Sequence, residues 1–598
     1  MTQSPAGALG PLHASAPAWA GQTDWRLLAT RFEPGLHFLK TWQAWRDDLQ
    51  RPQRLHYVGL SHAPPNTAEL LACAGSDPQL RALAREMAAQ WFELQPGFHR
   101  FTLDRGRVVL TLCVGELISL LREQSFSADH VFLDASSPGV GATPPWNRWS
   151  AKALARCCRR GTGLTATGNV ALVRADLVQC GFEIQATPNE DPEGSDHGLL
   201  HGQFNPRWTL RPPGGVSHGR APQPGTCVVV GAGLAGASVA SALARRGWQV
   251  QVLDRAAEPA AGASGLPVGL VVPHVSIDDC ALSRLSRAGV RLLIHEARSL
   301  LRQGDDWAPS GTLERSISGD SRQSDIWHAQ AAWLKPGQLV RAWLAQPGIT
   351  FQGGARVAFL RRHGEQWTLL DDQEQVLASA DRIVLANACG APALLQSVQA
   401  SNLSLKPQRH QLPALRGVRG QVSWALHAQT PDATFPPYPI NGAGSLISGV
   451  PWRDGVHSAR AWFAGATYQP DNQPEAAVNL NHAANLARVQ RLLPELGRAL
   501  TQSFIEGRVR AWQGTRCVTP DRLPLVGPLN EAAHPGLWLC CGMGSRGLSF
   551  SVLCAELLVA QWSGEPWAIE ARLARLLLAL RSPRTVPDAA LELTETDL

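Results

Sequence analysis

Two arginines near the end of the chain have the surroundings of carboxylate ligands. Arg516 lies in the turn-rich segment Trp512–Gly527, and Arg546 lies in the glycine-rich segment Gly542–Leu548, just before a predicted helix over 552–561. A planar guanidinium can hold a carboxylate through two parallel hydrogen bonds, although an internal salt bridge is the alternative role. The glycines expose N–H groups at the positive end of the helix, which suits an electron-rich ring edge such as that of a reduced flavin. We therefore expect Arg516 and Arg546 to bind a carboxylated substrate.

The segment Thr226–Asp254 has the pattern of a dinucleotide-binding unit: strand, tight glycine turn, helix, strand and acidic residue. In such a unit Gly231 makes the turn, Gly233 lets backbone N–H groups approach a pyrophosphate, and Gly236 lets the helix pack close to the strand. Asp254 can accept hydrogen bonds from a ribose 2′-OH. A glycine-rich helix start without a ligand is the alternative, but the flanking strands and the acid favour a dinucleotide.

A loop of small residues, Ala260–Pro273, follows the second strand. It offers a backbone path without bulky side chains, as is needed along a pyrophosphate or under a flat ring. Directly after a dinucleotide fold, such a loop favours FAD over NAD. The residues that we expect to contact FAD are Gly231, Gly233, Gly236, Asp254, Ala263, Ser264, Gly265, Gly269, Gly544, Ser545, Gly547 and Leu548.

The length of 598 residues and the distribution of proline and glycine predict more than one domain. Strand-like and helix-like segments alternate in the first third, and aromatic, β-rich stretches over 418–466 predict an antiparallel sheet in the second half. The expected division is a disordered lead-in (1–22), an α/β domain (23–205), a Pro/Gly-rich linker (206–224), a dinucleotide-binding domain with a discontinuous substrate part (225–580) and a tail (581–598).

Composition narrows the class of protein. Hydrophobic residues make up 44% and charged residues 17%, which is typical of a globular chain. No apolar run reaches 18 residues, no secretory signal precedes the first domain, and the 12 cysteines show neither a CxxC pair nor metal-ligand spacing. We expect a cytoplasmic protein, monomeric, with reduced cysteines, no metal and no membrane contact. A net charge of +6 permits an RNA partner without demonstrating one.

Three segments of the first third carry a family resemblance: Phe32–Leu39, Phe132–Pro138 running through Trp146, and Arg160–Thr167. They resemble the methyltransferase half of the bifunctional tRNA 5-methylaminomethyl-2-thiouridine biosynthesis enzymes. The resemblance implies a Rossmann-like domain that uses S-adenosylmethionine to methylate an aminomethyl group on the wobble uridine of tRNA. It also implies that Asp134 lies near the reacting amine.

The cofactor loop departs from that family, in which it typically reads close to GFGTGLNFL. Here the stretch is RFEPGLHFL, from Arg31 to Leu39. Glu33 and Pro34 bring a charge, a fixed φ and a lost N–H to a loop that should pass close to the cofactor. No carboxylate follows the predicted strand 55–58, and Cys113-Val-Gly115 replaces the usual Phe-Gly-Asp. We expect the fold to be retained and the cofactor loop to be degenerate. An active methyltransferase and a domain kept for docking or tRNA binding both stay open.

The second half, from Cys227 to Leu557, resembles FAD enzymes of the D-amino-acid oxidase and glycine oxidase superfamily, and specifically the oxidoreductase half of the same tRNA-modifying enzymes. The motifs are 263–273, 515–527 and 544–557, with Leu266 where the family usually has Asn. The implied fold class is α/β, a methyltransferase-type Rossmann-like domain followed by an FAD-binding Rossmann domain with an antiparallel-sheet substrate domain.

The implied reaction removes a carboxymethyl group from 5-carboxymethylaminomethyl-uridine. Arg516, with Arg546, would hold the substrate carboxylate while a hydride leaves the CH₂ for FAD. The resulting imine would hydrolyse to aminomethyl-uridine and glyoxylate. The alternative is a small-molecule glycine or amino acid oxidase whose N-terminal domain is vestigial or only docks RNA.

Overall fold

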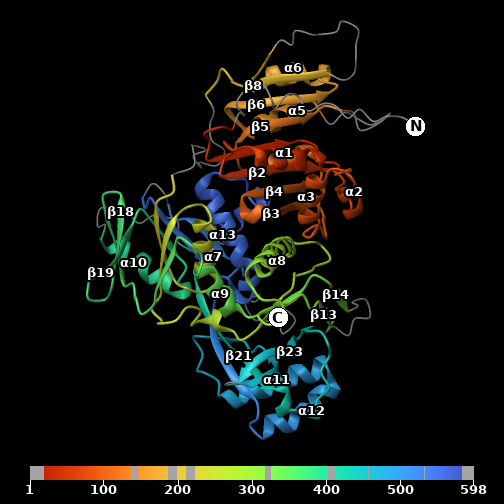
Figure 1. Cartoon of the computed structure of the whole chain (residues 1–598). Coiled ribbons are helices and arrows are strands. Elements are labelled where there is room, and N and C mark those ends of the chain that lie inside the picture. Colours follow the sequence, from red (N-terminus) through yellow and green to blue (C-terminus); the bar gives the residue numbers. More distant parts are fainter. Residues whose placement is uncertain are drawn as a thin grey trace. The chain divides into compact units, whose positions relative to one another are not determined.

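The computed structural model describes residues 19–136, 146–185, 198–209, 223–316, 325–401, 412–454, 457–530 and 533–581. Most of the expected lead-in and linker, the expected tail after Arg581, and Pro138 of the first resemblance lie outside these residues. The chain divides into two compact units (Figure 1). The first comprises Met1–Ala221 and Ser563–Ala571, and the second comprises Pro222–Trp562 and Arg572–Leu598.

The first unit is built on one mixed sheet in the order β3-β4-β2-β1-β5-β6-β8-β7. The central strands β4, β2, β1, β5 and β6 run parallel, and the outer strands pair antiparallel. This is the doubly wound arrangement expected from the sequence. The strands are β1 Asp24–Ala29, β2 Arg54–Ser61, β3 Gly97–Leu103, β4 Val108–Val114, β5 Ala128–Asp134, β6 Cys158–Gly168, β7 Phe182–Ile184 and β8 Gly198–Phe204.

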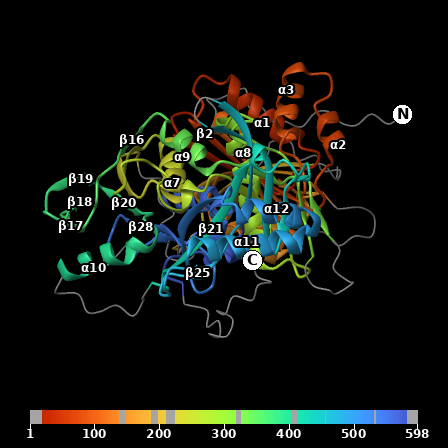
Figure 2. The same cartoon turned by 90° about the horizontal axis from the view of Figure 1, so that it is seen from below.

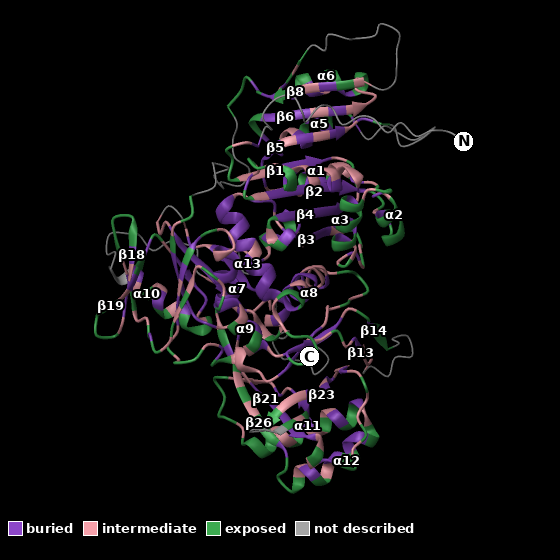
Figure 3. Ribbon diagram, viewed as in Figure 1, coloured by how far each residue is buried: buried purple, intermediate pink, exposed green. Residues whose placement is uncertain are grey.

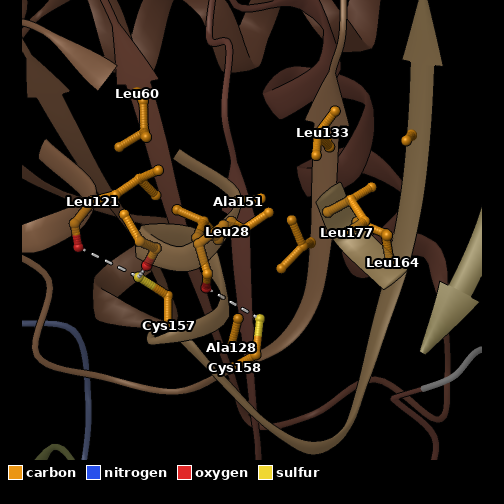
Figure 4. Packing of buried hydrophobic residues seen from close by; sticks show 14 of the residues in the cluster. Leu28, Leu60, Leu121, Ala128, Leu133, Ala151, Cys157, Cys158, Leu164 and Leu177 are labelled. Atoms are coloured by element: carbon orange, nitrogen blue, oxygen red, sulfur yellow. Dashed lines mark hydrogen bonds between the residues drawn. The ribbon is translucent and has the colours of Figure 1, made fainter. Parts of the chain in front are cut away.

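Helices cover both faces of this sheet. The helices are α1 Leu36–Asp47, α2 Thr67–Ala72, α3 Pro78–Ala88, α4 Leu117–Arg122, α5 Arg148–Ala155 and α6 Ala171–Gln179. One apolar cluster joins α1 and α3 to the sheet, and a second joins α4, α5 and α6 to the other face. In the second cluster Cys157 and Cys158 are buried among leucines and donate to backbone carbonyls (Figure 4). These two cysteines are therefore packing residues, as the sequence predicts.

The segment Ser563–Ala571 belongs to the first unit, although the sequence predicts it in the domain 225–580. Its Glu565 is fully buried and pairs with Arg54, whose Nη1 lies 3.1 Å from Oε1 of the carboxylate. Arg26 donates to the Ser563 carbonyl at 3.0 Å, and Arg100 donates to the Pro566 carbonyl. A buried charge needs a partner, so the cations of β1, β2 and β3 hold this distant segment.

The second unit contains a six-stranded sheet, β16-β10-β9-β20-β28-β27, parallel except for the edge strand β27. Figure 3 shows the two central helices, α7 and α13, almost wholly buried. The strands are β9 Thr226–Val230, β10 Gln249–Leu253, β16 Ile349–Gln352, β20 Arg382–Leu385, β27 Leu525–Pro528 and β28 Leu537–Cys541, and the helices are α7 Leu234–Ala244, α8 Ala281–Leu300, α9 Pro336–Leu344, α10 Ala391–Ser401, α13 Gly547–Ser563 and α14 Ala571–Arg575.

A larger, mainly antiparallel sheet follows the order β14-β13-β22-β23-β24-β21-β25, with β26 paired to β21, as predicted for residues 418–466. Helices α11 and α12 cover one face, while the other packs against Val268 and Trp333. The elements are β13 Thr312–Glu314, β14 Ile326–His328, β21 Arg416–Leu426, β22 Ile440–Gly442, β23 Gly444–Asp454, β24 His457–Gly465, β25 Gln469–Pro470, β26 Arg510–Val518, α11 Val478–Leu492 and α12 Pro494–Ile505.

Two three-stranded sheets complete the second unit. One has the order β11-β15-β12, and the other, β17-β18-β19, packs beside α10 (Figure 2). The residues Arg356–Leu360 predict a strand, and the strand observed there, β17, begins at Phe359. The bounds are β11 Gly269–Val271, β12 Trp307–Ala308, β15 Ala332–Leu334, β17 Phe359–His363, β18 Gln366–Leu370 and β19 Val376–Ala380.

Candidate functional site

The glycine turn between β9 and α7 has the close backbone approaches that a dinucleotide site requires. Gly231 adopts φ +110°, a left-handed conformation that favours glycine. A Cβ at residue 236 would lie 1.8 Å from the Gly231 carbonyl oxygen, so only glycine lets α7 begin this close to the turn. Gly233 stands at the N-cap of α7, where free N–H groups and the helix dipole favour a phosphate. This geometry fits the pyrophosphate of a dinucleotide.

Asp254 anchors the same turn. Its carboxylate accepts the N–H of Ala232 at 2.7 Å and the N–H of Ala256 at 2.9 Å. The sequence pattern predicts a ribose contact for this residue but not this backbone role. A carboxylate has about four acceptor positions, so two amide bonds leave capacity for a ribose hydroxyl. The ribose contact stays a prediction.

The short helix η3 (Ala263–Gly265) packs on the start of α7. The Ser264 hydroxyl accepts the N–H of Leu234 at 2.9 Å, and a Cβ at Gly233 would lie 3.0 Å from that hydroxyl. A side-chain oxygen thus satisfies one of the free amides at the helix N-terminus. The structure therefore brings Ala263, Ser264 and Gly265 against the glycine turn, as expected of a loop that borders the same ligand.

The third predicted segment, Gly542–Leu548, contacts both the helix that follows the glycine turn and the loop after η3. Gly544 and Ser545 lie in the short helix η6 (Gly544–Arg546), and α13 starts at the next residue. A Cβ at Gly547 would lie 3.4 Å from Leu234 Cδ1, and a Cβ at Gly269 would lie 2.7 Å from Leu548 Cδ1. All three glycine-containing segments thus converge at the N-terminus of α7, although they are far apart in the sequence.

Arg516 lies on β26 with a guanidinium that the surrounding protein only partly satisfies. Its Nη1 atom is buried and has no hydrogen-bond partner in the described residues. Its Cζ atom lies 4.9 Å from the ring centroid of Tyr468, and burial lowers the pKa of Arg516 below its ordinary value. Leaving a buried charged donor without an acceptor is costly, so this atom indicates a site for an anionic ligand.

The alternation of side chains along β26 decides on which face of the sheet the Arg516 side chain lies. Trp512, four residues earlier, lies on the same face of the strand because side chains alternate. Trp512 packs in the apolar cluster that contains Leu266 and Val268, from the loop after η3. The strand also adjoins η3 and η6. The guanidinium therefore belongs to the face of the antiparallel sheet that borders the predicted FAD loops.

Two residues that contact Arg516 are not among the site residues predicted from the sequence. A Cβ at Gly420 on β21 would lie 2.9 Å from Arg516 Nη1, so this glycine makes room for the guanidinium. Tyr468 supplies the aromatic face described above. Neither has a sequence signal, because both meet Arg516 only through sheet pairing and the turn after β24. Arg546 ends η6 and is partly buried, and its carboxylate-binding role stays a prediction.

Replacing Gly236 with alanine is expected to expel FAD. The new Cβ would collide with the Gly231 carbonyl oxygen, and overpacking of this kind costs about 1–3 kcal/mol or more, at least about fivefold in binding. Flavin absorbance per protein and the dissociation constant of FAD measure the effect. Gly262→Ala is the matched control, since a Cβ there meets nothing within 4 Å. Equal FAD affinity in both variants would contradict the assigned turn.

In the first unit, the altered loop closes on itself. Arg31 Nη1 lies 3.1 Å from Asp134 Oδ2 and its Nε lies 3.9 Å from Glu33. The Glu33 carboxylate accepts a hydrogen bond from the Ser61 hydroxyl at the end of β2. These residues stand at the carboxyl ends of β1, β2 and β5, where ligands bind in doubly wound folds. Both Arg31 and Glu33 depart from the family loop. Arg31 forms an ion pair with Asp134, and Glu33 accepts a hydrogen bond from Ser61.

Acid is expected to destabilise the first unit through two histidines near this loop. Burial, with a smaller effect of Lys40, lowers the pKa of His37 from 6.5 to about 4. Burial, with smaller effects of His201 and His37, also lowers the pKa of His130 from 6.5 to about 4. The unfolded chain binds these protons from about pH 6.5 downward, so stability falls as the pH drops from 6.5 towards 4. Between pH 7 and pH 5 the loss is up to about 2 kcal/mol for each histidine.

Hydrogen exchange of first-unit peptides at pH 7 and pH 5, corrected for intrinsic exchange rates, measures this loss. His130→Asn, which retains a polar group near Thr165, should flatten the pH dependence. His62→Asn, at an exposed position, should leave it unchanged. An identical slope in the wild-type protein and the His130 variant would contradict the assignment.

No described helix is both long and apolar enough to cross a membrane. Likewise, the described part of the chain contains no group of three or more His, Cys, Asp and Glu residues arranged to hold a metal ion.

Comparisons with known proteins agree with the two-unit structure. The family described as FAD dependent oxidoreductase matches residues 226–316 and 315–561, and the family described as S-adenosyl-L-methionine-dependent methyltransferase matches 78–191. The chain thus carries an oxidoreductase domain of an FAD family and a methyltransferase domain of an S-adenosylmethionine family. The methyltransferase match begins at residue 78, after the altered loop of residues 31–39. Among solved structures, glycine oxidase from Geobacillus kaustophilus is 18% identical, with a TM-score of 0.45, over 60% of this chain and 99% of that one.

Relatives resemble the chain over nearly its whole length. The tRNA 5-methylaminomethyl-2-thiouridine biosynthesis bifunctional protein MnmC of Albidiferax ferrireducens is 58% identical over 94% of both chains. The protein of the same name from Polaromonas sp. strain JS666 is 44% identical over 94% of this chain and 91% of its own. The chain therefore belongs to the family of tRNA 5-methylaminomethyl-2-thiouridine biosynthesis bifunctional proteins.

Proposed function

We propose that this protein modifies the wobble uridine of tRNA in the cytoplasm. Its second unit oxidatively removes the carboxymethyl group from 5-carboxymethylaminomethyl-(2-thio)uridine and leaves 5-aminomethyl-(2-thio)uridine. The name of the relatives supports the tRNA substrate. The single observation that carries the carboxylated arm is Arg516 Nη1, buried without a hydrogen-bond partner in the described residues.

The residues of the second unit divide the work between holding FAD and orienting the substrate. The turn at Gly231, the Ser264 loop and the start of α13 form the FAD cradle. When bound, FAD supplies the acceptor for the hydride that leaves the CH₂ between nitrogen and carboxylate. Arg516 fixes that carboxylate through its planar fork, and the Tyr468 ring holds the guanidinium in place. Hydrolysis of the substrate imine then releases glyoxylate.

The first unit keeps the methyltransferase fold with a weakened cofactor site. The Arg31–Asp134 ion pair occupies the carboxylate that the family resemblance places near the reacting amine. Glu33 adds a negative charge where the loop should approach the carboxylate end of S-adenosylmethionine, and Pro34 removes an N–H donor. Together these features favour a domain that docks tRNA and methylates poorly.

Incubation with tRNA that carries the carboxymethylaminomethyl group tests the proposal. The aminomethyl nucleoside should appear in digests both with and without S-adenosylmethionine. Oxidation of free glycine or sarcosine without oxidation of the tRNA would overturn the substrate assignment and favour a small-molecule oxidase.

The same assay, with S-adenosylmethionine present, tests the proposal that the methyltransferase domain methylates poorly. Methylated product from the wild-type protein would overturn the weakened cofactor site. The triple variant Arg31→Gly, Glu33→Gly, Pro34→Thr restores the family loop and should bind S-adenosylmethionine more tightly, as measured by calorimetry. Unchanged affinity would also contradict the role given to these three residues.

A further inference from the structure

Two cysteines from separate elements meet beside the predicted FAD and substrate sites. Cys389 lies on the short helix η4 (Ala388–Gly390), which follows β20, and Cys517 lies on β26 directly after Arg516. Their side chains are hydrogen-bonded to each other, and η4 adjoins β26. All 12 cysteines fall within the described residues, and only Cys389 is exposed. The pair therefore combines an accessible sulfur with a buried one.

The neighbourhood of the pair links it to both sites. A Cβ at Gly231 would lie 2.7 Å from the Ala386 carbonyl oxygen and 3.0 Å from Asn387 Cα, so the segment that leads into η4 lines the glycine turn. On the other side, Cys517 pairs with Gly417 of β21 in the sheet that carries Arg516. A bond between the two sulfurs would tie the glycine-turn segment to the substrate strand.

The two thiols differ in their ease of ionisation. The hydrogen bond to Cys517 lowers the pKa of Cys389, whereas the same hydrogen bond and burial raise the pKa of Cys517. Cys389 is thus the thiol of the pair that ionises more readily, with Cys517 able to donate a hydrogen bond to it. A low-pKa, accessible thiol beside a second cysteine is the arrangement found in redox-sensing pairs.

We propose that Cys389 and Cys517 form a reversible disulfide that responds to peroxide. The Cys389 thiolate attacks one peroxide oxygen, so an S–O bond forms, the O–O bond breaks, and the departing hydroxide takes a proton to become water. Cys517 then attacks the resulting sulfenic acid, the S–S bond forms, and the S–O oxygen leaves as a second water. Two thiols and one hydrogen peroxide thus give one disulfide and two waters. A dithiol reductant reverses the change by thiol–disulfide exchange.

Peptide mapping of the FAD-loaded protein tests the disulfide without any turnover assay. After limited hydrogen peroxide treatment, two thiols should be lost, and the peptides that contain Cys389 and Cys517 should be linked until dithiothreitol is added. Cys517→Ser should leave a sulfenic acid on Cys389 that a dimedone probe traps. Cys73→Ser, a partly exposed cysteine of the first unit, is the control and should still form the link. Absence of the link, or a link from Cys389 to Cys541 instead, would overturn the proposal.

The expected effect of the disulfide on activity rests on the proposed function, and turnover is measured separately from the peptide mapping. Because the disulfide pulls the residue after Arg516, it should displace the guanidinium, and a misplacement of about 1 Å costs up to about 100-fold in rate. Oxidation of the wild-type protein should lower turnover and raise KM for the tRNA substrate, with recovery after reduction, while Cys389→Ser stays active throughout. A mapped disulfide in a protein without tRNA activity would sink the proposed function but keep the thiol pair. A disulfide that leaves turnover unchanged would overturn the link to Arg516.

Discussion

Replacing Arg516 with methionine will lower kcat/KM for the carboxymethylaminomethyl tRNA by about 30-fold or more, without loss of FAD. The carboxylate would lose a buried, bidentate partner, and such a loss costs about 2–5 kcal/mol, with 1.4 kcal/mol for each factor of ten. Arg516→Lys should recover only part of the activity, because an ammonium is a point charge that cannot form the parallel pair of hydrogen bonds. Steady-state kinetics and flavin absorbance measure both effects.

Stability should change in the opposite direction from activity. In the protein without substrate, the Arg516 guanidinium has a buried nitrogen with no partner in the described residues. Removing that unpaired charge should leave the free energy of unfolding unchanged or raise it. Arg510→Gln, near the exposed start of the same strand, is the control and should retain turnover. A destabilised Arg516→Met protein with a normal KM would show that Arg516 is structural.

The second large effect is expected at Glu565. Glu565→Gln keeps the side-chain volume but removes the charge that faces Arg54 at 3.1 Å, and His56 lies 3.9 Å from the other oxygen. Breaking a buried ion pair costs about 3–5 kcal/mol, and the lower end applies here because Arg54 is partly exposed and keeps Asp24 at 3.8 Å. Burial holds the pKa of His56 well below its ordinary value, so His56 stays neutral and the Arg54 guanidinium is the cation that loses its carboxylate partner.

Peptide-resolved hydrogen exchange over β1, β2 and β3 measures the loss locally, which matters because a chain of two units need not unfold in one step. Asp47→Asn, an exposed acid at the end of α1, is the matched control and should change protection by less than about 0.5 kcal/mol. FAD content should stay constant in both variants. Unaltered exchange in Glu565→Gln would show that the carboxylate contributes little to the first unit.

The parts of the fold that the sequence predicted are those specified by neighbouring residues. The turn at Gly231, the helix after Gly236 and the strand before Asp254 are contiguous, and their periodicity and glycine spacing are visible without any tertiary contact. Likewise, the helical run 174–180 is followed by a glycine, which predicts the end of a helix, and Gly181 adopts φ +100° after α6.

The parts that could not be predicted depend on contacts between distant residues. Arg31 and Asp134 are 103 positions apart, and no local pattern around either residue indicates that they form an ion pair. Tyr468 reaches Arg516 only because β21 pairs with both β25 and β26. Within a single sequence, nothing marks such pairs, since their charges and rings resemble those of any surface residue.

The late segment that completes the first unit also sets the order of events on the ribosome. Arg54 and Glu565 are separated by 511 positions. At about 5–20 residues per second, the β2 cation emerges roughly 25–100 s before its partner is translated. During that interval Arg54 lacks the Glu565 carboxylate, while Asp24 of β1, 3.8 Å from its guanidinium in the folded unit, is already present. The methyltransferase-like half is thus the first to begin synthesis, yet it is complete only after Ala571, when nearly all of the second unit has been translated.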